Sequence, residues 1–131
     1  MVNYLAVLVA AVVAFLLGFI WYGPLFGKIW MKLSGMPDVK PKKKDMMLRS
    51  LGGLASYIVM AYVLARIFDL INVVALSEGL WVGFLAWLGF VGTITFGSFL
   101  WEKKPFNLWL LNNVYNLISL LIMAWIFVVW V

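Results

Sequence analysis

The segment YLAVLVAAVVAFLLGFIWY, residues 4–22, decides the fold class because it contains no Asp, Glu, Lys or Arg. A bilayer hydrocarbon core of ~30 Å requires about 20 apolar residues in an α-helix, so this segment predicts a membrane-spanning helix. Three further segments meet the same criterion, and they cover residues 47–67, 79–100 and 107–130. We therefore expect an all-α integral membrane protein, a four-transmembrane-helix bundle that forms a single membrane domain over residues 1–131.

The composition of the chain supports this class and narrows the chemistry. Of the 131 residues, 66% are hydrophobic and 11% are charged, whereas soluble domains are roughly 45–50% apolar and 25% charged. His and Cys are absent, which removes thiol nucleophiles, disulfides, the commonest general base and the commonest metal ligands. Only five scattered carboxylates remain. We therefore expect no enzyme activity, no metal site and no cofactor.

The basic residues lie almost entirely on one side of the predicted helices. Only Arg66 lies on the other side, at the far end of the second segment. The remaining nine of the ten basic residues are Lys28, Lys32, Lys40, Lys42, Lys43, Lys44, Arg49, Lys103 and Lys104. The positive-inside rule then predicts a multi-pass protein of the inner, cytoplasmic membrane with both loops in the cytoplasm and both termini outside. Because this bias opposes inverted pairs, we expect any homo-oligomer to be parallel.

The basic cytoplasmic loop, residues 27–46, opens with an amphipathic pattern that predicts a short helix in the lipid headgroup region. The apolar residues of this pattern are Phe26, Ile29, Trp30 and Leu33. A cluster of lysines follows, at Lys42, Lys43 and Lys44. Two interpretations remain open: these lysines bind anionic lipid headgroups or an acidic partner, or they only determine topology. Because the charge lies beside apolar segments, we expect a lipid surface rather than nucleic acid as the partner.

The fourth segment carries a stripe of polar side chains. Its members fall within about a third of the helix circumference, and they are Asn112, Tyr115, Asn116 and Ser119. An amide that faces lipid leaves its donors and acceptors unpaired, so the stripe should face other helices or a hydrated cavity. Two interpretations stay open, a polar path for a solute and interhelical hydrogen bonding worth about 0.6–2 kcal/mol per bond.

The third segment combines a face of small residues with an acidic end. Small side chains at helical spacing let helix backbones approach closely, which predicts a packing seam. The residues of this face are Gly79, Gly83, Ala86, Thr93 and Gly97. Glu102 closes the segment at the predicted depth of Arg49. These two residues predict an interfacial salt bridge or, alternatively, a gate at the mouth of the polar stripe.

Three motifs resemble an uncharacterised bacterial membrane family, domain of unknown function 1761. They are GFIWYGPLFGKIWM (Gly18 to Met31), WLGFVGTITFGSFLWEKKP (Trp87 to Pro105) and LLNNVYNLISLLIMAWIFVVW (Leu110 to Trp130). Trp101 stands before Glu102, and Leu111-Asn112 stands where the family usually has Ile-Asn. The resemblance implies four helices and a membrane location, and it implies no activity.

The sequence leaves three classes of function. The first is passive permeation or transport of a small solute along the Asn-rich stripe, without a buried charge to couple protons or voltage. The second is a non-catalytic accessory or assembly subunit of a larger membrane complex. The third, an enzyme that acts on lipid, is the least favoured because His and Cys are absent.

Overall fold

The structure, a computed structural model, describes residues 2–35 and 42–130. Within these residues every regular element is helical, and four stretches are long and apolar enough to cross a membrane: Tyr4–Leu25, Lys43–Ile71, Leu76–Leu100 and Phe106–Val129. The helices are α1 (Tyr4–Ile20), α2 (Gly27–Ser34), α3 (Lys43–Ile71), α4 (Leu76–Ala86), α5 (Thr93–Thr95), α6 (Gly97–Leu100) and α7 (Phe106–Val129), and the π-helical turns are η1 (Trp21–Leu25) and η2 (Trp87–Gly92). The prediction of four long apolar helices is confirmed.

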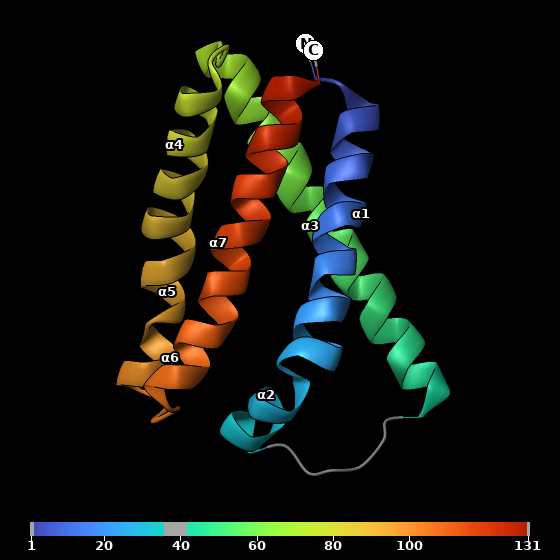
Figure 1. Cartoon of the computed structure of the whole chain (residues 1–131), viewed down its shortest axis with the longest axis vertical. Helices are drawn as coiled ribbons and strands as arrows, with labels where there is room; N and C mark the ends of the chain where they lie inside the picture. The colour runs from blue at the N-terminus through green and yellow to red at the C-terminus, as the bar shows by residue number, and fades with distance from the viewer. Residues whose placement is uncertain (1, 36–41, 131) are drawn as a thin grey trace.

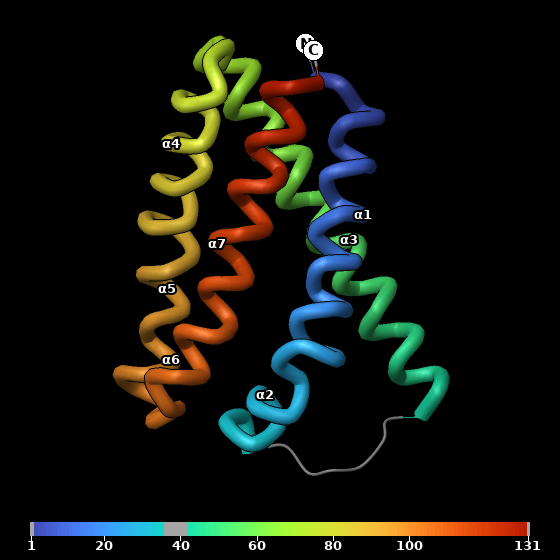
Figure 2. Tube along the Cα trace, viewed as in Figure 1, coloured from blue at the N-terminus to red at the C-terminus, as the bar shows by residue number. Residues whose placement is uncertain are grey.

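The long helices form two antiparallel pairs (Figure 1). α1 packs against α3, and α4 packs against α7, while contacts between α1 and α7 join the two pairs. The pairs lie close together at the end that carries both termini and diverge toward the opposite end, where α2 lies (Figure 2). The molecule therefore has a closed end and an open end.

Small side chains explain why the closed end is tight. The residues buried there from α1, α3 and α7 are mostly alanines, which allow helix axes to approach closely. They are Ala10, Ala11, Ala14, Ala61, Ala65 and Ala124, and each is at most 8% exposed. Leu120 and Met123 of α7 complete this core.

The first span ends where its sequence can no longer continue as a helix. Pro24 lacks an amide hydrogen, and Gly23 takes a non-helical conformation (φ −104°, ψ −106°). The chain turns there and re-forms as α2, which ends at Gly35 in the left-handed conformation (φ 68°). The predicted short helix is present, and its position in the headgroup region stays a prediction. Residues 36–41 of the basic loop lie outside the described residues.

The third span contains a π-helical turn, η2, between α4 and α5. A π turn holds one residue more than an α turn, so the residues after it face a different direction than uniform α-helical spacing predicts. Thr95 of α5 donates to the Asn113 side chain of α7, whereas Thr93 is exposed and bonds to the Gly89 carbonyl of its own helix. This shift brings Thr95 into the site described below.

Candidate functional site

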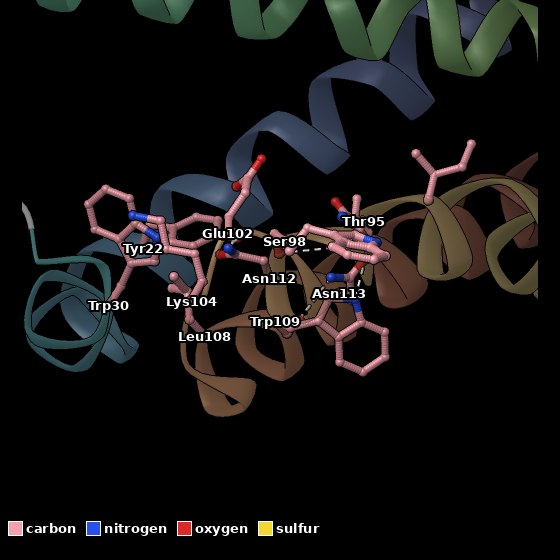
Figure 3. A pocket seen from close by; sticks show the side chains of 14 residues that line it. Tyr22, Trp30, Thr95, Ser98, Glu102, Lys104, Leu108, Trp109, Asn112 and Asn113 are labelled. Carbon is pink, nitrogen blue, oxygen red and sulfur yellow. Dashed lines mark hydrogen bonds between the residues drawn. The ribbon is translucent and has the colours of Figure 1, made fainter.

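A cavity of about 930 Å³ lies at the open end, between the α1–α2 region and the helices α5 to α7 (Figure 3). Its walls combine indole rings, amides and hydroxyls, and two charged residues, Glu102 and Lys104, also line it. The aromatic and polar residues around it are Tyr22, Trp30, Thr95, Ser98, Trp101, Trp109, Asn112, Asn113 and Asn116. Three of the four asparagine side chains of α7 therefore line the same cavity.

Asn112 connects the end of the first span to α7. The Tyr22 hydroxyl donates to the Asn112 side-chain oxygen at 2.7 Å, and the Trp21 indole donates to the Leu111 carbonyl at 3.2 Å. Both donors belong to η1, where the Gly23-Pro24 break turns the chain. The π-helical end of the first span therefore forms one wall of the cavity, and these two hydrogen bonds connect it to α7, which forms the opposite wall.

Asn113 connects the third span to α7 on the opposite wall. Its side chain is 2% exposed, and it accepts from the Thr95 hydroxyl at 2.7 Å and donates to the Trp109 carbonyl at 2.8 Å. The Trp109 indole donates to the Thr95 oxygen at 3.2 Å, and the Trp87 indole donates to the Asn113 carbonyl at 2.9 Å. Because both polar groups of its side chain are hydrogen-bonded, Asn113 connects helices and is not free to bind a solute.

Tyr115 joins three helices directly beside the cavity. Its buried hydroxyl donates to the Ala14 carbonyl at 2.7 Å and lies 2.6 Å from the Tyr57 hydroxyl. Since a hydroxyl carries one hydrogen, Tyr57 donates the second of these bonds. Gly18 leaves the space for this arrangement, because a Cβ atom there would lie 2.8 Å from the Tyr115 oxygen. Tyr115 is therefore a buried, hydrogen-bonded contact between α1, α3 and α7.

Asn116 and Ser119 differ from the other members of the stripe. Asn116 is half-buried and lines the cavity, and its amide has no hydrogen-bond partner within residues 2–35 and 42–130. Ser119 is 1% exposed, and its hydroxyl also lacks a partner in the described part of the chain. Of these two residues, only Asn116 presents its polar group to the cavity, because Ser119 is buried beside Leu120. Asn112 also lines the cavity, and in the described residues only its side-chain oxygen is bonded.

The structure does not bring Glu102 and Arg49 together. Glu102 lines the cavity described above, whereas Arg49 lines a separate cavity between α1 and α3. The predicted salt bridge between them is therefore not formed in the described residues. No cluster of three acidic side chains that could hold a metal ion occurs there either. The gating interpretation of Glu102 stays a prediction.

The predicted small-residue face is divided by the π turn. Gly79 and Gly83 are buried against α7, since Cβ atoms there would lie 2.5 Å from Val128 and 3.3 Å from Ala124. Ala86 is half-buried, Thr93 points away and Gly97 lines the cavity. The prediction of one continuous packing face is wrong for the residues that follow Ala86. The 3.6-residue periodicity of an α-helix does not hold through η2, which begins at Trp87.

Lys42, Lys43 and Lys44 are exposed at the start of α3. Their role in binding lipid headgroups stays a prediction. Sequence reasoning did not identify Tyr22, Tyr57, Thr95 or the tryptophans as parts of the site. A signal was present for Tyr57, a hydroxyl in the middle of an apolar span, but none predicted the π turn that orients Thr95.

The sequence of this chain is similar to one known protein family. A family model described as "Protein of unknown function (DUF1761)" matches residues 5–128. The chain belongs to this family. The resemblance seen in the three motifs is thus confirmed. The four apolar helices of this DUF1761 chain are compatible with a multi-pass membrane protein. Neither the curated proteins nor the solved structures yield a match.

Proposed function

We propose that this protein lies in the cytoplasmic membrane, with its open end toward the cytoplasm, and transports a small uncharged polar solute. The observation that carries this proposal is the half-buried, unpartnered amide of Asn116 in a cavity of about 930 Å³. Free amide groups both donate and accept hydrogen bonds. They would replace the hydration of a solute that carries hydroxyl or amide groups.

The distribution of charge supports an uncharged solute. Glu102 and Lys104, which contribute opposite charges, lie at and just beyond the end of the third span. The cavity wall on α7 consists of amides and apolar side chains, without an acidic or basic residue. An ion would meet no compensating charge there, which makes its entry costly.

The shape of the cavity supports a carrier rather than an open pore. The cavity follows α7 only as far as Asn116. Beyond it, the buried residues Ser119, Leu120 and Met123 form a packed layer. Passage would then require the α1–α3 pair to move relative to the α4–α7 pair, with the contacts at Tyr22 and Tyr115 breaking in turn. We propose that these two pairs are the moving units.

The proposal is tested with purified protein in liposomes. Swelling in glycerol and in urea, followed by light scattering, should exceed that of protein-free liposomes and should saturate with concentration. Asn116→Leu should reduce the swelling rate about tenfold, the equivalent of one lost hydrogen bond. Asn107→Leu is the matched control, because Asn107 is exposed on the same helix and does not line the cavity. Swelling that survives Asn116→Leu contradicts the proposal.

A role as an accessory subunit is the second candidate, and the outer face of the third span favours it. Large apolar side chains there are exposed and do not line the cavity, with Phe90 at 73%, Trp81 at 59% and Leu88 at 45%. In a membrane this face contacts either lipid or another protein, including a second, parallel copy of this chain. Co-purification with a larger partner at fixed stoichiometry, without flux by the isolated protein, would favour this role over transport.

A further inference from the structure

A second cavity, of about 550 Å³, lies between the first and second spans and contains one charged side chain, that of Arg49. It is separate from the Asn-lined cavity, and Tyr22 is the only residue that lines both. Its walls are aromatic rings and small residues, with Met46 at the end near the start of α3. The remaining residues are Phe15, Gly18, Phe19, Gly23, Ser50, Gly53 and Tyr57.

The groove exists because α1 and α3 diverge toward the open end (Figure 2) and because glycines interrupt its aromatic walls. A Cβ atom at Gly53 would contact only the Phe15 ring, at 3.9 Å, and one at Gly23 would contact nothing within 4 Å. The space is therefore open along the facing sides of both helices. In a bilayer, an apolar groove of this kind is filled by hydrocarbon, since leaving it empty forfeits dispersion contacts.

The positive charge of Arg49 in the groove favours a negatively charged occupant. Arg49 has no ion-pair partner in the described part of the chain, although Asp45 lies one helical turn before it. Lys42, in extended conformation just before α3, and the exposed Lys43 and Lys44 at the start of this helix precede Arg49 in the sequence. A guanidinium group binds a phosphate through two parallel hydrogen bonds. Arg49 is thus suited to a phosphate that approaches from the open end of the groove.

We propose that this groove binds one anionic glycerophospholipid, with its phosphate on Arg49 and an acyl chain along Phe15 and Phe19. The inference rests on the proposed membrane location and not on transport. A free phosphate would satisfy Arg49 but would leave the aromatic walls uncovered. A zwitterionic lipid would gain less from the adjacent lysines, each of which attracts anionic lipid with about 1 kcal/mol near a membrane surface.

The test measures the thermal unfolding of the delipidated protein in a neutral detergent. Added dioleoylphosphatidylglycerol should raise the Tm by several degrees, because a ligand that binds only the folded state stabilises it. Dioleoylphosphatidylcholine and glycerol 3-phosphate should produce less than half of that shift. Arg49→Gln should weaken phosphatidylglycerol binding about tenfold or more. Arg66→Gln, an exposed arginine on the same helix outside the groove, should leave it unchanged.

A groove-filling variant tests the acyl chain separately. Gly53→Leu keeps Arg49 and should abolish the phosphatidylglycerol shift, because its side chain occupies the groove. The proposal is overturned if Arg49→Gln or Gly53→Leu keeps the full shift, if phosphatidylcholine equals phosphatidylglycerol, or if glycerol 3-phosphate alone suffices. Solute flux is measured in parallel. Flux without a lipid shift refutes this site alone, whereas a lipid shift without flux refutes only the proposed transport.

Discussion

The polar side chains of α7 fall into two groups with opposite environments. Asn112 and Asn116 line the cavity at the open end. Tyr115, which lies between them in the sequence, and Ser119 are at most 2% exposed. The difference shows that a polar stripe on one helix does not by itself make a path. The neighbouring helices decide which of its members can meet a solute.

The side chains that face α7 explain the difference. At the closed end, alanines of α1 and glycines of α4 lie against it and allow close approach. At the open end, the facing residues are bulky aromatic side chains, among them Trp21, Tyr22 and Trp30. Small residues thus close one end of the bundle, and large residues keep the other end apart.

The largest expected effect comes from separating the helices at the closed end. In Gly83→Leu, the new Cβ atom would lie 3.3 Å from Ala124 and 3.4 Å from the backbone oxygen of Leu120. Backbone cannot yield as a flexible side chain does, so we expect a loss of about 2–3 kcal/mol, seen as a lower Tm. Gly97→Leu is the control, because a Cβ there meets only Trp101 at 4.0 Å. Equal losses from both variants would contradict the contrast between the two ends.

The next effect comes from the hydrogen bonds of Tyr115. Tyr115→Phe removes the bonds to Ala14 and Tyr57 and should cost about 1–2 kcal/mol in thermal unfolding. Tyr22→Phe should cost about 0.6 kcal/mol or less, because the Asn112 amide faces the cavity and gains water instead. If Tyr22→Phe is the more destabilising of the two, the open end is not hydrated.

Two amides of α7 that lie three residues apart provide a smaller and more local contrast. Asn113→Leu breaks the buried bonds with Thr95 and Trp109 and should cost about 1 kcal/mol. Asn116→Leu removes no bond within the described residues and should change stability by less than about 0.5 kcal/mol. Thermal unfolding of both variants in one detergent is the measurement. Strong destabilisation by Asn116→Leu would show that its amide has a partner.

The smallest expected effect has the opposite sign. Ser119→Ala removes a buried hydroxyl that has no partner in the described residues, and burying such a group is unfavourable. The variant should therefore raise the Tm slightly, by the equivalent of up to about 1 kcal/mol. Ser56→Ala, at an exposed hydroxyl bonded to the Gly52 carbonyl, should leave it nearly unchanged. A fall in Tm for Ser119→Ala would mean that the hydroxyl is paired.

Local patterns were sufficient for the helices and insufficient for the site. The four apolar lengths and the short amphipathic helix after the first span both follow from patterns of nearby residues, and the helices are present in the structure. The predicted salt bridge between Glu102 and Arg49 is not formed in the part of the chain that the structure describes. Two residues at the same predicted depth in the membrane can belong to helices that are not neighbours. The small-residue face failed beyond Ala86 because a single π turn rotated the rest of the span.

The four long apolar helices of this DUF1761 chain could be predicted from its sequence, because hydropathy and helix length are properties of consecutive residues. Its charge distribution also supports one predicted orientation. The packing of the helices was needed to show that Asn116 faces a cavity, that Tyr115 is buried and that Arg49 faces a different groove. Those outcomes depend on how far apart residues from different helices lie, and the size of the side chains between the helices sets that distance.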